Sequence, residues 1–172
     1  TLICIARGIC RALEAVQAAR VVHRDVTPAN IILRTGFEKT RDAKVCLIDF
    51  GLAKCLGEAL GLTRTGQIMG TPAYMAPEQA GGEQERIGPL CDVYSLGATL
   101  YEALTLTRPF HGDTSQQVFQ QILLVDPPNP REIRSRVPRD LVEQDFGLIG
   151  CMAVADPAIA KGCASTQGGW AG

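Results

Sequence analysis

The sequence predicts a mainly α-helical domain with a few short β-strands. Apolar residues recur at three- and four-residue spacings over residues 2–19, 92–104 and 115–125, which is the pattern of helices with a buried face. Short apolar runs bounded by turn residues predict small buried strands at Val21–Val22, Ile31–Leu33 and Val45–Ile48. At 172 residues the chain has the length of one domain and can bury a core.

The predicted helices differ in their ends. The first begins at Thr1 without a capping residue, so we expect the natural chain to extend upstream. Asp92 suits the N-cap or the first turn of the second helix, which Arg108-Pro109-Phe110 ends. The third helix is followed by the Pro-rich residues 126–130, for which we predict an extended connector.

Composition limits the partners and the compartment. The formal net charge of −1 gives no electrostatic reason to expect nucleic acid or an anionic membrane. The seven cysteines contain no C-x-x-C pair, and most lie in apolar runs, which predicts buried free thiols. An odd cysteine count without a signal peptide favours a reducing, cytoplasmic location. A membrane anchor elsewhere in a longer chain stays open.

Three polar side chains follow or flank the predicted strands. Asp25 supplies a carboxylate, Asn30 an amide oxygen five residues later, and Asp49 a second carboxylate. Loops flanked by strands would bring these groups to one edge of the fold. Hard oxygen ligands suit Mg²⁺, which completes its shell with water and phosphate oxygens. The pattern therefore predicts a site for phosphate chemistry.

Three ordered motifs carry a family resemblance. His23-Arg24-Asp25 with Asn30, then Asp49-Phe50-Gly51, then Ala76-Pro77-Glu78 resemble the catalytic core of protein kinases. The sequence of residues 70–78 resembles the substrate-docking segment of serine/threonine kinases. Together with the plain composition and its reduced thiols, this segment resembles bacterial kinases of the eukaryotic (Hanks) type. Only twenty-two residues precede His23, too few for the small lobe, so the chain looks like the C-terminal large lobe of such a kinase.

The resemblance implies a role for each polar residue and for one strand. Asp25 would accept or orient the proton of the substrate hydroxyl, while Asn30 and Asp49 would hold Mg²⁺. Ile32 and its strand neighbours would pack beneath the adenine of ATP. Thr27 departs from the family, which usually has Lys there to neutralise the transferred phosphoryl group. Either catalysis is weakened, or another cation compensates.

Other residues would support or regulate the site. The resemblance implies that His23 and Phe50 pack in the core and that Asp92 anchors the backbone of the His23–Arg24 turn. Arg24 would pair with a phosphate on the following loop, for which Thr63 and Thr65 are the candidate acceptors.

Two residues of the docking segment complete this set. Thr71 would hydrogen-bond near Asp25 and position the acceptor. Glu78 has no counterpart of the family's Arg partner, and Lys161 is the one cation left to approach it. An unpaired buried carboxylate at this position would be costly, of order 3–5 kcal/mol when one partner is lost.

The sequence thus predicts a large lobe over residues 1–150 and a degraded or frayed end of the same domain over residues 151–172. The function predicted is a protein serine/threonine kinase that uses ATP and Mg²⁺, incomplete as written. Its partners would be protein substrates with Ser or Thr acceptors, and a second copy for autophosphorylation in trans. A pseudokinase-like or truncated binding module is the alternative, whereas a metal-dependent hydrolase has no supporting motif.

Overall fold

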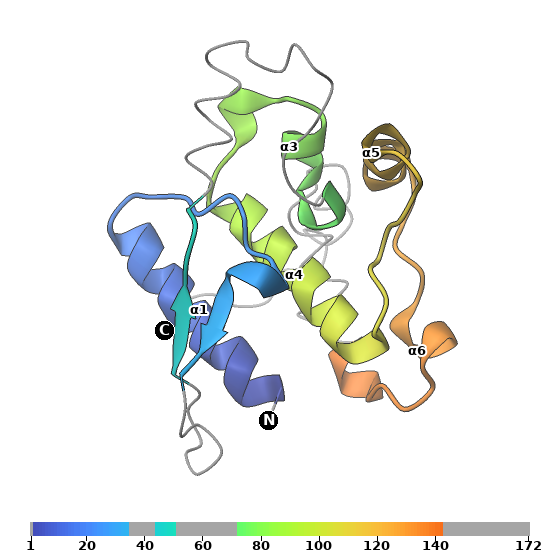
Figure 1. Cartoon of the computed structure of the whole chain (residues 1–172), viewed down its shortest axis with the longest axis horizontal. Helices are drawn as coiled ribbons and strands as arrows, with labels where there is room; N and C mark the ends of the chain where they lie inside the picture. Colours follow the sequence, from blue (N-terminus) through green and yellow to red (C-terminus); the bar gives the residue numbers. More distant parts are fainter. Residues whose placement is uncertain (1, 35–43, 51–71, 143–172) are drawn as a thin grey trace, which may run out of the picture.

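Helix α4 (Pro89–Thr105) runs through the middle of the structure, a computed structural model that describes residues 2–34, 44–50 and 72–142 (Figure 1). The helix begins with Pro89, whose fixed φ suits a first helical position, and ends at Leu106 in the left-handed conformation. Asp92 therefore lies in the first turn, and the N-cap is Gly88. Most of the helix is buried, as its nearly all-apolar sequence predicts.

Helix α1 (Leu2–Ala18) and a two-stranded sheet pack on one side of α4. Strands β1 (Ile31–Leu33) and β2 (Val45–Leu47) are antiparallel, with Ile31 opposite Leu47 and Leu33 opposite Val45. These elements confirm the predicted helix and two of the predicted strands. The strands are not buried on both faces, however, because the central Ile32 remains 46 % exposed. The small core here consists of Ile9, Leu13, Val26 and Leu96.

The prediction of a strand at Val21–Val22 is wrong. Both residues have irregular backbone, and Val21 is 40 % exposed. The Val21 amide donates to the Val16 carbonyl at 3.1 Å, and Arg20 takes a positive φ of 56°. Val21 thus completes the end of α1, so its amide is not available to a strand partner.

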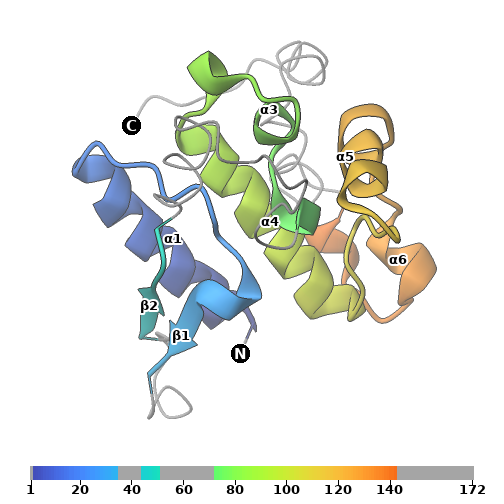
Figure 2. The ribbon, with the colours of Figure 1, turned by 45° about the horizontal axis from the view of Figure 1, so that its top comes forward.

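The remaining elements lie on the other side of α4 (Figure 2). They are the short helices η3 (Pro72–Tyr74), α3 (Pro77–Ala80) and η4 (Gln84–Arg86), followed by α5 (Ser115–Leu124), α6 (Pro130–Ile133) and η5 (Arg139–Leu141). A larger core joins η3 and α5 to α4; it contains Ala73, Tyr74, Ala76, Cys91, Tyr94, Ala98, Phe110, Val118 and Ile122. The described residues thus bury two apolar clusters, one on each side of α4.

The predicted helix over residues 115–125 is confirmed as α5, which has a capping box. Thr114 Oγ1 accepts from the Gln117 amide at 3.3 Å, and Gln117 Oε1 accepts in return from the Thr114 amide at 3.3 Å. The extended connector ends one residue earlier than predicted. Pro130 begins α6, because the Asn129 side chain accepts from the Arg131 amide at 2.9 Å and caps the helix.

The cysteine prediction is only partly right. The four cysteines in the described part of the chain are free thiols, but only Cys91 is buried. Cys10 is exposed because α1 buries another face, and Cys46 because it lies beside Ile32 on the open face of the sheet. Within residues 2–34, 44–50 and 72–142, no helix is long and apolar enough to cross a bilayer.

Candidate active site

The turn at His23 and Arg24 is bound to the first turn of α4. Asp92 is fully buried; its Oδ2 accepts from the His23 amide at 2.9 Å and its Oδ1 from the Arg24 amide at 2.7 Å. Burial raises the pKa of the Asp92 carboxyl, against the opposing effect of these two hydrogen bonds. Arg24 has a φ of 66°, in the left-handed region that non-glycine residues rarely occupy. The two hydrogen bonds therefore hold a strained turn in place.

Three more polar residues follow Asp92 along the same face of α4. Ser95, Thr99 and Glu102 succeed it at spacings of three, four and three residues. Ser95 Oγ donates to the Tyr74 carbonyl at 2.7 Å, and Thr99 Oγ1 donates to the Val26 carbonyl at 3.1 Å. Glu102 accepts from the Tyr74 hydroxyl. We call these four residues the polar face of α4.

Sequence reasoning missed three members of the polar face: Ser95, Thr99 and Glu102. A signal was present, because polar residues at helical spacing inside a nearly apolar helix must find partners where the helix is buried. Gln79 was missed as well. Its Nε2 donates to the Arg24 carbonyl at 3.0 Å and ties α3 to the same turn. The turn thus has hydrogen bonds from two helices.

Asp25 and Asn30 are brought together. Asn30 Nδ2 donates to the Asp25 carboxylate Oδ2 at 2.9 Å and to the Asp25 backbone carbonyl at 2.9 Å. The short helix η1 (Pro28–Asn30) makes this possible, because it returns the chain towards Asp25, and the Asn30 amide donates to the Thr27 carbonyl at 3.0 Å. Since Nδ2 makes both bonds, the amide oxygen Oδ1 is the atom of Asn30 that could bind a metal ion.

Asp49 lies at the same end of the hairpin as Asn30. The Ile48 amide donates to the Asn30 carbonyl at 3.0 Å, which extends the pairing of β1 and β2 by one position. Asp49 follows with a φ of 54°, a second non-glycine residue in the left-handed region. The described residues contain no group of three His, Cys, Asp or Glu that could hold a metal ion. Magnesium, which keeps water and phosphate ligands, still suits the Asn30 and Asp49 oxygens.

His23 and Phe50 contact each other, with ring centroids 4.5 Å apart and planes tilted by 34°. His23 is fully buried, and its Nδ1 accepts from the Asp25 amide at 3.3 Å. In the described part of the chain, its Nε2 is buried without a hydrogen-bond partner. Phe50 is 38 % exposed, so its ring is not fully buried in the core, and it lies against His23. The two rings join the two motif loops.

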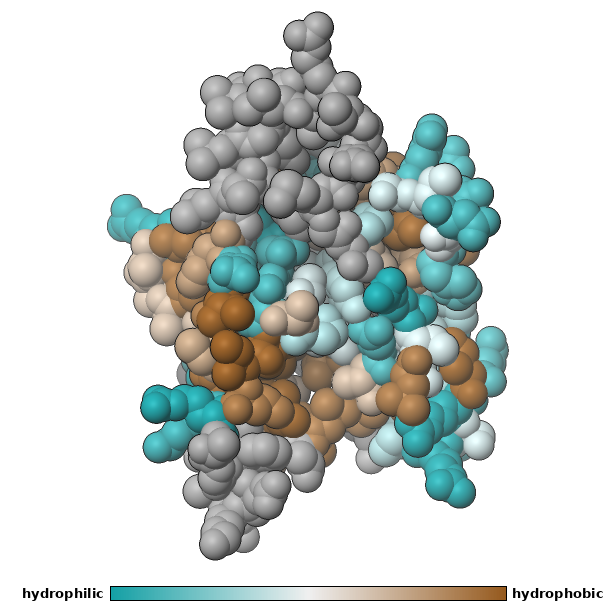
Figure 3. Space-filling view, viewed as in Figure 1, coloured by the Kyte–Doolittle hydropathy of each residue, from teal (hydrophilic) through white to brown (hydrophobic). Residues whose placement is uncertain are grey.

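A cleft of about 830 Å³ opens beside Asp25. Figure 3 shows apolar side chains gathered on this side of the molecule, over α1 and the hairpin. Thr27 lines the cleft, whereas Ile32 does not, because it lies on the opposite side of β1 from Ile31 and Leu33. The cleft is also lined by Asn30, Tyr74, Thr99, Glu102 and Arg108.

Three of the residues predicted to regulate the site lie outside the described residues: Thr63, Thr65 and Thr71. Glu78 is buried in the first turn of α3. Glu78 is not without an interaction partner in the described structure.

The geometry of Asp92 predicts the effect of Asp92→Asn. The amide retains one acceptor oxygen but faces the other backbone amide with an NH₂ group, so we expect unfolding free energy to fall by about 1–3 kcal/mol. Chemical denaturation followed by circular dichroism measures this loss. The exposed Asp113→Asn is the matched control. An equal effect of the two substitutions would contradict the anchoring role of Asp92.

The same pair of variants tests the raised pKa of Asp92. A folded-state pKa above the ordinary value of 3.8 means that the contribution to stability is complete below that pH and is lost as the pH rises through the folded-state pKa. The difference in unfolding free energy between the wild-type protein and Asp92→Asn should therefore shrink as the pH rises from about 4.

Comparisons with known proteins identify the family of the chain. The family model of the protein kinase domain matches residues 2–157. The chain is 43 % identical over 149 residues to serine/threonine-protein kinase PknA of Mycobacterium tuberculosis, which covers 87 % of this chain and 31 % of that protein. It is 41 % identical over 124 residues to the probable serine/threonine-protein kinase SCO3848 of Streptomyces coelicolor, covering 72 % of this chain and 17 % of that protein. Tyrosine-protein kinase MasK of Myxococcus xanthus is 40 % identical over 128 residues, covering 74 % of this chain and 18 % of that protein.

The chain spans less than a third of the length of each of these relatives. The match to the family model nevertheless covers most of the chain and includes all three sequence motifs. The chain therefore belongs to the protein kinase family, among the bacterial serine/threonine protein kinases of the eukaryotic type.

Proposed function

We propose that residues 1–150 form the C-terminal large lobe of a kinase that transfers the γ-phosphoryl group of ATP to Ser or Thr hydroxyls of proteins. Residues 151–172 would be a degraded end of the same domain. The observation that carries the proposal is the contact between Asn30 Nδ2 and the Asp25 carboxylate at 2.9 Å, in a turn fixed by Asp92. It orients a base at a cleft large enough for substrate.

The chemistry needs little beyond positioning and charge stabilisation. Asp25 would accept or orient the proton of the acceptor hydroxyl, because a carboxylate held by an amide donor keeps one orientation towards the cleft. Asn30 and Asp49 would hold Mg²⁺, which neutralises charge on the phosphates when it is bound. The apolar strand β1, with Ile32 on its open face, would pack against the adenine.

One observation favours a second candidate function, a binding module without turnover. Thr27 lines the cleft two residues from Asp25, at the position where the resemblance expects the Lys ammonium. Thr supplies a hydroxyl and no charge, so the transferred phosphoryl group would lack one neutralising cation. A pseudokinase-like protein that binds a partner could retain the same fold.

Asp25→Asn in the complete native protein tests the proposed base. The protein is captured from its source by an antibody against residues 72–142. If Asp25 is the base, the rate of ³²P transfer from ATP to protein acceptors should fall by about 10²–10⁴-fold. Asp126→Asn, an exposed substitution of the same kind, should leave the rate unchanged. Native protein that transfers no phosphate would favour the binding module.

The same assay identifies the acceptor. We expect the label on phosphoserine and phosphothreonine after acid hydrolysis. Label on phosphotyrosine alone would contradict the serine/threonine assignment and agree with the name of the relative MasK, a tyrosine-protein kinase.

Thr27→Lys tests whether the absence of a cation at this position limits turnover. If the missing cation limits turnover, the substitution should raise kcat, because an ammonium at this position stabilises charge on the phosphoryl group. Thr27→Met has a comparable length without the charge and serves as the control. An unchanged kcat in Thr27→Lys would indicate that another cation already supplies this charge.

Regulation by phosphorylation is part of the proposal. A phosphate on Thr63 or Thr65 adds about two negative charges, which the Arg24 guanidinium could bind. A second copy of the chain would supply it by autophosphorylation in trans. Phosphopeptide mapping of active native protein should find at least one of the two threonines modified. Both sites unmodified in a fully active preparation would rule out this mechanism.

A further inference from the structure

Positive charge is concentrated in the segment from α6 to η5, although the formal net charge of the chain is −1. Arg131, Arg134, Arg136 and Arg139 lie within nine residues, and Glu132 is the one carboxylate among them. Three of these arginines are exposed, and Arg131 is partly buried. Among the described side chains, none of the four forms an ion pair with a carboxylate. This part of the surface therefore suits an anion.

The backbone folds the segment into a tight turn. The Val137 amide donates to the Arg134 carbonyl at 3.0 Å, and Arg131 Nη1 donates to the Val137 carbonyl at 2.8 Å. Val137 is only 3 % exposed, so it anchors the turn in the protein. These two hydrogen bonds bring the charge of Arg131 next to the turn that carries Arg134 and Arg136.

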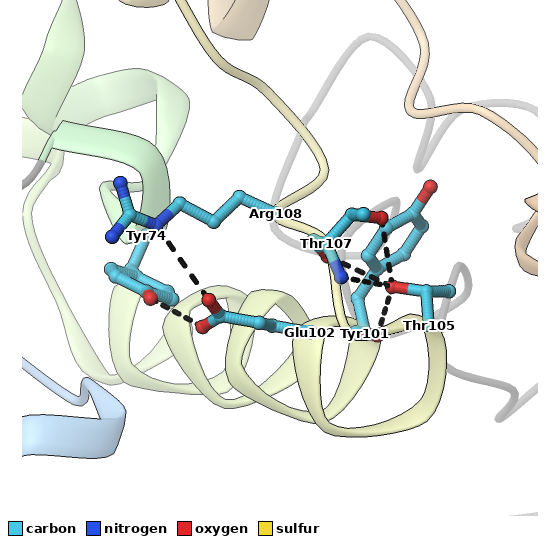
Figure 4. Close-up of polar contacts among 6 residues, drawn as sticks. All are labelled: Tyr74, Tyr101, Glu102, Thr105, Thr107 and Arg108. Carbon is cyan, nitrogen blue, oxygen red and sulfur yellow. Dashed lines mark hydrogen bonds and ion pairs between the residues drawn. The ribbon is translucent and has the colours of Figure 1, made fainter.

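The turn rests on the C-terminal end of α4, which has hydrogen bonds of its own. Arg134 Nη1 donates to the Leu104 carbonyl at 3.2 Å. Beside it, Thr105 Oγ1 lies 2.8 Å from the Tyr101 carbonyl and 2.8 Å from the Thr107 carbonyl (Figure 4). The bond to Leu104 uses one of the five N–H donors of the guanidinium. The charged end of Arg134 thus has a defined place and further donors for an anion.

Ser135 and Arg136 are the two central residues of this turn. The Ser135 side chain is exposed, and within the described residues its hydroxyl has no hydrogen-bond partner. Guanidinium groups that share one turn repel one another. A phosphate on Ser135 would place about two negative charges among them and accept charge-assisted hydrogen bonds from them. The turn therefore combines an accessible hydroxyl with the cations that would bind its phosphate.

We propose that Ser135 is a phosphorylation site and that Arg131, Arg134 and Arg136 bind its phosphate. Ser135 Oγ forms a bond to the γ-phosphorus of ATP, the bond from this phosphorus to the β,γ-bridging oxygen breaks, and ADP leaves. The hydroxyl proton passes to the Asp25 carboxylate. Neither Ser135 nor the arginines line the cleft beside Asp25, so this base belongs to a second copy of the chain. The inference rests on the proposed kinase function and names one acceptor for it.

The modification can be mapped to a single residue. Cleavage after Glu132 and Glu143 releases residues 133–143, in which Ser135 is the only residue with a hydroxyl group. After the full native protein is incubated with ATP, mass spectrometry should find one phosphate on this peptide. The full-length Asp25→Asn variant should carry this phosphate only after incubation with wild-type protein, because the transfer takes place between copies.

The rate at which a phosphatase removes this phosphate tests the arginines. Bound guanidinium groups shield it, so Arg134→Gln in the full chain should speed removal about tenfold, the factor for one lost hydrogen bond to a charged group. Arg134→Lys retains a charge and should give an intermediate rate. Arg86→Gln is the matched control, because Arg86 is an exposed arginine of η4 that pairs with Glu83. It should leave the rate unchanged.

The possible failures are distinguishable. Label on other acceptors with residues 133–143 unmodified would overturn the inference while the kinase function stands. An Asp25→Asn variant phosphorylated at Ser135 without wild-type protein would assign the transfer to another kinase, and it would also overturn the inference. Equal removal rates for wild-type protein and Arg134→Gln would overturn the role of the arginines. Wild-type protein without any phosphoryl transfer would overturn the proposed function and this inference together.

Discussion

The buried carboxylate of Asp92 is the constraint on which the candidate site depends. A charge removed from water needs strong compensation, and here two backbone amides of one turn supply it. The same bonds stabilise Arg24 in a left-handed conformation, whose cost is of order 1–3 kcal/mol. A hydrogen bond to a charged group contributes about 1.5–3 kcal/mol, which is of the same order as this cost. The turn that carries Asp25 is therefore set by α4.

The polar face of α4 extends this control from one turn to two segments. Asp92 and Thr99 bind the turn before η1, whereas Ser95 and Glu102 bind Tyr74 in η3. Successive polar residues on one helix face lie about 5–6 Å apart, and a packed helix is stiff. Both segments are thereby fixed to the same rigid element. Catalysis by positioning depends on such rigidity, because small displacements of reacting groups cost large factors in rate.

The hairpin provides the second fixed relation. Its antiparallel register places Ile31 opposite Leu47, and one further hydrogen bond joins Ile48 to Asn30. Asn30 is in turn hydrogen-bonded to Asp25, and Asp49 follows Ile48 in the chain. Asp25, Asn30 and Asp49 are therefore connected through hydrogen bonds and the peptide bond between Ile48 and Asp49. Register in a two-stranded sheet is an all-or-none property, because a slip of one residue reverses every side chain. The register of the hairpin therefore gives the loops that carry Asn30 and Asp49 one defined position relative to each other.

The sequence by itself determined the three long helices and both strands, because their signals are local: apolar residues at a period near 3.6 residues, and short β-branched runs. It could not decide that Val21–Val22 would end a helix instead of forming a strand, or that Cys10 and Cys46 would face solvent. Tertiary structure decided these points, since burial depends on what packs against a residue. It also decided the partners of the polar face, which are 68 residues apart for Asp92 and Arg24 and 73 for Thr99 and Val26. Spacing along the chain shows that a buried polar group needs a partner, but only the fold selects which one.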